Sequence, residues 1–239
     1  MKKKFRKNIY VTLALFLLFV LWTLAIKFID VQTIGPRGSA VGFAALNGFI
    51  HNVTGVHMEL YIITDWLGLV PVFISFGFAV LGLVQLIKRR SFLKVDYNIL
   101  VLGGFYILVM SAYILFEMFA VNYRPVLIDG YLEASYPSST TLLVMCVMPT
   151  SIMQFNTRIK NESVRNIIFV VISVFTAFMV IGRFISGVHW LTDIIGGIIL
   201  SAGTTRSSTA ACTPSTSHGT TATASTPAGT SICSTTGSP

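Results

Sequence analysis

Three ionisable residues stand in an otherwise apolar stretch of the chain. Residues 182–197 read GRFISGVHWLTDIIGG and contain Arg183, His189 and Asp193. If a helix begins near Val188, His189 and Asp193 lie four positions apart on one helix face. The aspartate can then accept a hydrogen bond from imidazole Nδ1, fix the tautomer and leave Nε2 as a nucleophile. A guanidinium binds phosphate oxygens through paired hydrogen bonds, so these residue types together indicate phosphate chemistry.

The elements that must position these residues are membrane helices. Of 239 residues, 54% are hydrophobic and 11% are charged, whereas soluble domains have about 45–50% and about 25%. The sequence therefore predicts an all-α fold, a polytopic membrane helical bundle with six core helices. Five segments approach the ~20 apolar residues of a membrane span, and a sixth begins at Trp190; the five are 9–28, 61–87, 97–121, 141–155 with its polar flanks, and 167–185.

Most basic residues lie in segments that are predicted to face the same side of the membrane. The formal net charge is +8, and basic clusters precede the first segment and follow the second and the fourth. The loops 30–60 and 122–139 hold only Arg37 and Arg124 as basic residues. Short basic loops stay in the cytoplasm, so we predict a multi-pass cell-membrane protein with a cytoplasmic N-terminus and its candidate site on the outer face. This distribution argues against nucleic acid as the partner.

Each candidate residue also has a purely structural explanation. Arg183 can extend to the interface, His189 can anchor there and Asp193 can cap a helix. Asp65, at the start of the second segment, has the simple role of favouring a helix N-terminus. However, Arg124 comes from a separate loop and maps to the same interface. Because ionisable groups in membrane segments are costly, this convergence favours a functional site.

From residue 203 the composition changes. The remaining segment is rich in Ser and Thr, and Ile232 is its only large aliphatic residue, so it cannot bury enough apolar surface to fold. The apolar run 190–202 is about 20 Å long as a helix, shorter than the ~30 Å bilayer core. We therefore predict a membrane domain, 1–202, with a truncated sixth helix, and a disordered low-complexity tail, 203–239. Two explanations of the tail stay open, namely a natural Ser/Thr/Pro-rich extension and a shifted reading frame near residue 203.

The spacing in the opening stretch resembles the third motif of the type 2 phosphatidic acid phosphatase superfamily, membrane phosphatases built on six core helices. That motif reads S-R-x5-H-x3-D, and this chain has Gly182, Arg183, His189 and Asp193 at its four positions. The resemblance covers roughly residues 60–202. It implies that His189 is the nucleophile that forms a phosphohistidine, Asp193 its orienting partner and Arg183 a phosphate clamp. It implies a metal-independent hydrolase without a cofactor.

The other two motifs of the family are present with substitutions. The motif K-x6-R-P stands as Glu117 and Arg124-Pro125, and the motif P-S-G-H stands as residues 137–140 with the sequence PSST. A carboxylate at position 117 repels phosphate unless it turns away or pairs with Arg124. The resemblance implies phosphate binding by these motifs and the third; the residues concerned are Arg124, Ser138, Ser139, Thr140 and Arg183.

Thr140 stands where the family has the histidine that protonates the leaving group. A positioned general acid contributes ~10²–10⁴ in rate, or ~3–5 kcal/mol, and a hydroxyl is far too weak an acid to replace it. An alkoxide needs this proton, whereas a phosphate leaving from a diphosphate is a weaker base and needs it less. The substitution therefore favours a lipid diphosphate over a phosphatidate.

The predicted function is hydrolysis of a lipid phosphate or diphosphate, such as a prenyl diphosphate, at the outer face through a phosphohistidine intermediate. The alternative is a catalytically impaired membrane protein that binds lipid phosphate, which Glu117 and Thr140 favour. A small transporter ranks last, because transporters place charges near the midplane of the membrane. A poorly anchored sixth helix would leave the site of any of these incomplete.

Overall fold

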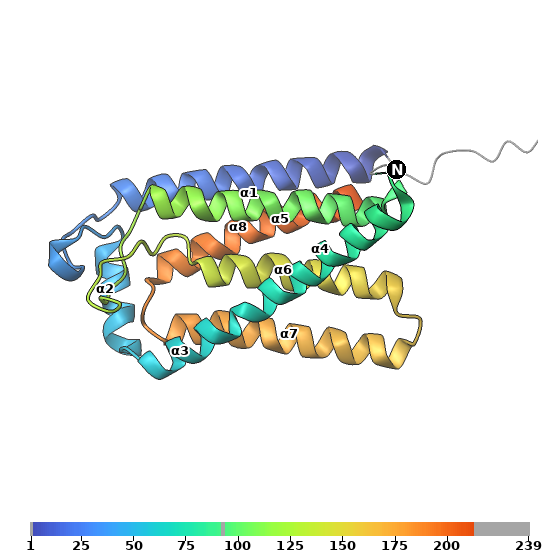
Figure 1. The fold of residues 1–239 in the computed structure, drawn as a ribbon. Coiled ribbons are helices and arrows are strands. Elements are labelled where there is room, and N and C mark those ends of the chain that lie inside the picture. The colour runs from blue at the N-terminus through green and yellow to red at the C-terminus, as the bar shows by residue number, and fades with distance from the viewer. Residues whose placement is uncertain (1, 92–93, 213–239) are drawn as a thin grey trace, which may run out of the picture.

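The computed structural model describes residues 2–91 and 94–212. The described residues form long helices that lie side by side as an elongated bundle (Figure 1), which confirms the predicted all-α membrane bundle. The elements are α1 (Lys2–Phe28), a 3₁₀ turn (Pro36–Gly38), α2 (Ala44–Thr54), α3 (Met58–Leu67), α4 (Leu69–Arg89), α5 (Tyr97–Met118), α6 (Ser139–Arg158), α7 (Glu162–Ile185) and α8 (Leu191–Cys212).

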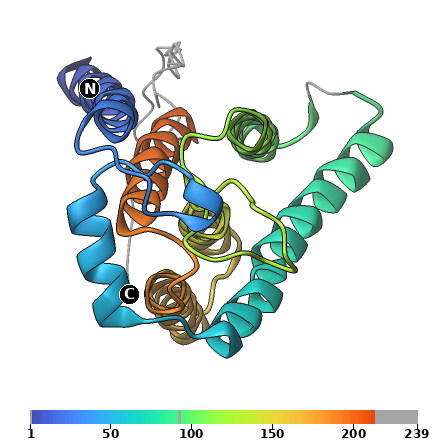
Figure 2. The ribbon, with the colours of Figure 1, turned by 90° about the vertical axis from the view of Figure 1, so that its left-hand side faces the viewer.

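The six predicted segments correspond to α1, the α3–α4 pair, α5, α6, α7 and α8. Of these, α1, the α3–α4 pair, α5 and α7 are long and apolar enough to cross a membrane. The second predicted segment is broken at Gly68, where a Cβ atom would lie 2.9 Å from the Asp65 carbonyl oxygen. Figure 2 shows the consequence, since α4 slants away from the bundle while α3 stays beside α7. The short helix α2 was not predicted.

Helix α8 lies at the centre of the bundle, against α1 and α6. Trp22 on α1 donates its indole N–H to the Thr192 carbonyl oxygen at 3.2 Å, and Asn47 on α2 donates to the Thr192 hydroxyl at 3.0 Å. The buried Tyr136 hydroxyl lies 2.7 Å from the hydroxyl of Thr23, and its ring packs so closely on α8 that a Cβ at Gly196 would lie 2.4 Å from it. These contacts fix the start of α8 relative to the loop 119–138.

The predicted end of the sixth helix at residue 202 is wrong, because α8 continues to Cys212. Its 22 residues span about 33 Å, enough for the bilayer core. The Thr204 hydroxyl donates to the Leu200 carbonyl at 2.8 Å and lies 3.3 Å from the Cys146 sulfur, and the Thr205 hydroxyl donates to the Met145 carbonyl at 3.2 Å. Threonine is tolerated here because its hydroxyl is satisfied within the bundle. Residues 213–239 of the predicted tail lie outside the described residues.

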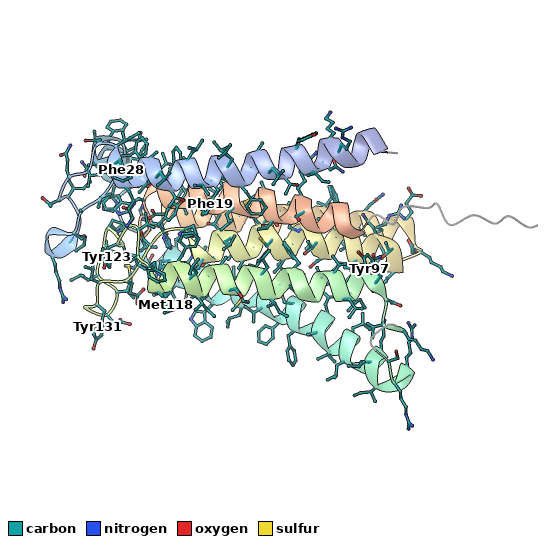
Figure 3. All side chains as sticks on the ribbon, turned by 90° about the horizontal axis from the view of Figure 1, so that it is seen from above. Phe19, Phe28, Tyr97, Met118, Tyr123 and Tyr131 are labelled. Atoms are coloured by element: carbon teal, nitrogen blue, oxygen red, sulfur yellow. The ribbon has the colours of Figure 1, made fainter. Side chains whose placement is uncertain are left out.

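A cluster of charged side chains joins three helices at one end of the bundle. At one end, Asp96 lies 3.1 Å from Arg89 and 3.9 Å from Arg158, which joins the ends of α4, α5 and α6. A hydrogen bond from Gln85 and these two arginines lower the pKa of Asp96. Figure 3 shows Tyr97 at this end and Phe28, Met118, Tyr123 and Tyr131 at the other. The candidate residues lie at the second end.

Candidate active site

Three of the candidate residues, Arg124, Ser139 and His189, line a cavity. It lies at the end of the bundle where Figure 3 places Phe28 and Met118. Arg183 and Asp193 lie beside it and are not among its lining residues. The volume of the cavity is about 250 Å³. The last turns of α5, the loop 119–138, the first turns of α6 and the turn before α8 supply the lining residues, which include Tyr113, Phe116, Glu117, Arg124, Glu133, Ser139 and His189. The sequence predicted that the loop and this turn converge, and the structure brings them together.

His189 lies in the turn before α8, because α8 begins only at Leu191. Its Nδ1 atom is 3.1 Å from the Ser135 carbonyl oxygen. A carbonyl oxygen only accepts, so Nδ1 carries the hydrogen and Nε2 keeps its lone pair. The Nε2 atom is buried and has no hydrogen-bond partner among the described residues. Burial, reinforced by the charges of Arg124 and Arg183, lowers the pKa of His189 well below its ordinary value of 6.5, so the imidazole is neutral at physiological pH.

Asp193 does not accept the hydrogen bond predicted from His189. Within the described chain its Oδ2 atom accepts from the Ser135 hydroxyl at 2.6 Å and from the Trp190 backbone N–H at 3.0 Å, and Oδ1 accepts from Asn122 at 3.3 Å. The prediction failed because it assumed that the helix already contains His189. Asp193 instead reaches back to the residue that precedes the helix, as in a capping box. It thereby holds Ser135, whose carbonyl orients the imidazole.

Arg183 is almost fully buried, with 1% of its surface exposed. Its Nη2 atom donates to Asp65 Oδ1 and to Thr140 Oγ1, both at 2.6 Å. Its Nε and Nη1 atoms have no hydrogen-bond partner in the described part of the chain. The expectation that Asp65 merely favours a helix N-terminus is wrong, since its carboxylate forms an ion pair with Arg183.

Arg124 has a similar set of unused donors. Its Nε atom lies 3.1 Å from Glu133 Oε2, an ion pair without the alignment of a hydrogen bond, and neither Nε nor Nη1 has a hydrogen-bond partner among the described residues. The partner considered from the sequence, Glu117, instead lines the cavity. Two guanidinium groups and one imidazole nitrogen therefore lie near each other with hydrogen-bonding atoms free.

The three polar side chains of the motif at residues 137–140 point in different directions. Ser138 is fully buried; its hydroxyl accepts from Thr141 at 3.1 Å, and its backbone N–H donates to the Asp193 carbonyl at 3.1 Å. Ser139, the first residue of α6, lines the cavity. Thr140 contacts Arg183. Among the described residues, the predicted phosphate binders that line the cavity are thus Arg124 and Ser139.

Several residues of the site were missed from the sequence. Tyr61 lies near both arginines, with its ring centre 4.8 Å from Arg183 Cζ and 5.7 Å from Arg124 Cζ. Ser135 and Asn122 hold Asp193. Asn122 and Ser135 lie in a loop, where no helical periodicity predicts which way a side chain points. Of the four residues, Asp65 alone has a carboxylate side chain at a membrane segment, a feature that could have marked it as a site residue. No group of three or more His, Cys, Asp or Glu side chains in the described ranges has the arrangement of a metal site.

Comparison with known proteins bears on the predicted family resemblance. Residues 119–216 match the family model of the PAP2 superfamily. No curated protein sequence matches the chain. A similar solved structure is the first transmembrane PAP2 type phosphatidylglycerolphosphate phosphatase from Bacillus subtilis, with a TM-score of 0.60, 15% sequence identity, and coverage of 84% of this chain and 94% of that chain. The predicted resemblance to this superfamily is therefore confirmed, with the family-model match over residues 119–216 and a similar fold in the solved structure.

Proposed function

We propose that the chain is a membrane phosphatase that hydrolyses a lipid phosphate or diphosphate at the outer face through a phosphohistidine intermediate. The observation that carries the proposal concerns buried nitrogen atoms. Six buried side-chain nitrogen or oxygen atoms have no hydrogen-bond partner among the described residues, and five of them belong to Arg124, Arg183 and His189. Leaving a buried donor unpaired costs about 1–3 kcal/mol. Four of the five atoms are N–H donors of the two arginines, and Arg124 Nε among them already lies 3.1 Å from Glu133. The gathering of these donors at one place supports an anionic ligand, and the free lone pair of His189 Nε2 supports attack on that ligand.

The chemistry follows from the tautomer of His189. The Nε2 lone pair attacks the terminal phosphorus, and the bond from this phosphorus to the leaving oxygen breaks. The electron pair stays on that oxygen, which leaves as part of the lipid monophosphate when the substrate is a diphosphate, or as the lipid alkoxide, which takes a proton from solvent, when it is a monophosphate. The Nδ1–H donates to the Ser135 carbonyl and so stabilises the imidazole ring as it gains positive charge. Water then attacks phosphorus, the P–N bond breaks, its electrons return to Nε2, and the proton of the water passes to solvent. Arg124 and Arg183 stabilise the negative charge on the phosphoryl oxygens in both steps.

The leaving group determines which substrate this site hydrolyses best. The Thr140 hydroxyl is bound to Arg183 and supplies no acidic proton at the position of the family's histidine. A departing phosphate is a weaker base than an alkoxide and needs a proton less, so we expect a diphosphate to be hydrolysed faster than a monophosphate of the same lipid. Assays of the two esters on one prenyl chain test this preference, and faster hydrolysis of the monophosphate would contradict it.

A second candidate function is binding of a lipid phosphate without turnover. Two observations favour it, namely the carboxylates of Glu117 and Glu133 in the cavity wall and the threonine at position 140. The two functions differ in the covalent adduct, since only the enzyme transfers the phosphoryl group to His189.

The deciding experiment measures phosphate release from a prenyl diphosphate and a phosphatidate by the purified protein in detergent. His189→Ala is compared with His57→Ala, a matched control at the same end whose imidazole contacts the Thr54 carbonyl at 2.9 Å. We expect release by the wild type and the control but not by His189→Ala, with a phosphohistidine trapped under alkaline quench. Release that persists in His189→Ala would refute the mechanism, and phosphate binding without release or adduct would establish the second function.

The side of the membrane is tested separately. Tyr131 lies at the cavity end (Figure 3) and is 72% exposed, whereas Lys160 is exposed at the opposite end between α6 and α7. In intact cells, a membrane-impermeant thiol reagent should label Tyr131→Cys and not Lys160→Cys. The reverse pattern would place the cavity on the cytoplasmic side.

A further inference from the structure

Helix α3 contacts both arginines of the candidate site, although it lies outside the region that matches the family. Tyr61 and Asp65 are four residues apart on this helix and so share one face. The Tyr61 ring lies over the guanidinium of Arg183 and near that of Arg124. Asp65 accepts from Arg183 at 2.6 Å. Helix α3 therefore makes two contacts with Arg183 and one with Arg124.

The position of α3 depends on the glycine that begins the third motif. A Cβ atom at Gly182 would lie 2.8 Å from the methyl carbon of Thr64, and Thr64 is fully buried. The family motif has serine at this position, and a serine side chain here would push Thr64 away. Gly182 thus allows α3 to lie close enough to α7 for the contacts of Tyr61 and Asp65 with Arg183.

We propose that Tyr61 and Asp65 are positioning residues, which hold Arg183 and Arg124 with their free N–H groups directed at one phosphate. The inference rests on the proposed function. The two guanidinium groups repel each other, and the negative face of the tyrosine ring next to both of them offsets this repulsion. Asp65 binds only Nη2 of Arg183, which leaves Nε and Nη1 for the ligand. The carboxylate therefore fixes the arginine without occupying those donors.

The test uses pairs of substitutions at each position. Asp65→Ala and Tyr61→Leu remove the contacts, whereas Asp65→Asn keeps an oxygen acceptor and Tyr61→Phe keeps the ring. Glu59→Ala and Trp66→Leu are matched controls on the same helix, at exposed side chains. The measurements are kcat and KM for phosphate release, the Kd of inorganic phosphate by calorimetry, and the temperature of thermal unfolding in detergent.

We expect Asp65→Ala and Tyr61→Leu to lower kcat by roughly tenfold or more, because a misplaced binding group costs mainly at the transition state. We also expect them to weaken phosphate binding by about tenfold, since about one charge-assisted contact loses its geometry. Asp65→Asn and Tyr61→Phe should stay within about threefold of the wild type. The controls should match the wild type, and all variants should unfold within a few degrees of it.

Three results would overturn the inference. A higher rate in Asp65→Ala would mean that the carboxylate competes with phosphate. Wild-type kcat and Kd in Asp65→Ala and Tyr61→Leu would mean that neither residue positions the arginines. Equal losses in the conservative and the truncating variants, with lower unfolding temperatures, would mean that α3 matters only for packing. In each case histidine-dependent release by the wild type would leave the proposed function intact, whereas a wild type that neither binds nor releases phosphate would refute both.

Discussion

Replacement of Arg183 by lysine tests the phosphate site most directly. Lysine keeps the positive charge but cannot present separate Nε and Nη donors. In the structure Nη2 is engaged by Asp65 and Thr140, so the two free donors are the ones available to the ligand. A lysine ammonium group here would donate to Asp65 and Thr140, and at most one N–H would remain to donate to phosphate.

The expected loss follows from the number of hydrogen bonds removed. A hydrogen bond to a charged group contributes about 1.5–3 kcal/mol, and each 1.36 kcal/mol changes a rate tenfold. Loss of one such bond to the transition state should therefore lower kcat/KM by about 10- to 150-fold, and loss of both by more. The fold should survive, because the ion pair with Asp65 can still form.

The assay is phosphate release from the preferred lipid substrate in detergent, with thermal unfolding of the same samples. Arg165→Lys is the matched control, since it lies on the same helix at the far end, where its side chain is 34% exposed and pairs with Glu162. We expect the control to keep the wild-type kcat/KM. A fall of less than threefold in Arg183→Lys, with an unchanged unfolding temperature, would show that the unpaired donors do not bind phosphate.

Four further predictions concern pH and packing. Because the pKa of His189 lies well below 6.5, phosphohistidine formation, corrected for substrate ionisation, should fall less than twofold from pH 7.5 to pH 6, where an ordinary histidine would lose about fourfold of its neutral form; a fourfold fall would show that its pKa is normal. The same shift means that the unfolded chain binds the proton more tightly, so the contribution of His189 to stability is present above pH 6.5 and decreases as the pH falls below it, which denaturation at several pH values would detect. Gly196→Ala should destabilise the protein by about 1–3 kcal/mol because of the clash with Tyr136, while Gly103→Ala, with open space around it, should not; equal unfolding temperatures would contradict the packing. Ending the chain after residue 202 should lower the unfolding temperature and the activity, because it removes the part of α8 that Thr204 ties to α6; an unchanged protein would show that this part of α8 is dispensable.

The sequence alone determined the membrane bundle and predicted the candidate site residues Arg124, Arg183 and His189. Long apolar segments are a property of composition and order, so the positions of the long helices could be predicted from the sequence, and the clustered basic loops predict their orientation in the membrane. Arg183, His189 and Asp193 could be recognised by their spacing because they lie on consecutive parts of the chain, namely the last turn of α7, the turn before α8 and the first turn of α8. Arg124 was predicted from the same family pattern, and the structure places it at the same cavity.

The tertiary structure decided which atoms these residues contact. The hydrogen-bond partner of His189 is a backbone carbonyl in a loop 54 residues earlier. Every residue has a backbone carbonyl, so no pattern of side chains predicts which one the imidazole contacts. The extension of α8 beyond residue 202 depends on partners for its threonine hydroxyls, which composition alone cannot supply. The roles of Tyr61 and Asp65 depend on how closely α3 packs on α7. Periodicity fixes which face of a helix is apolar, but only packing between distant helices fixes which polar groups meet.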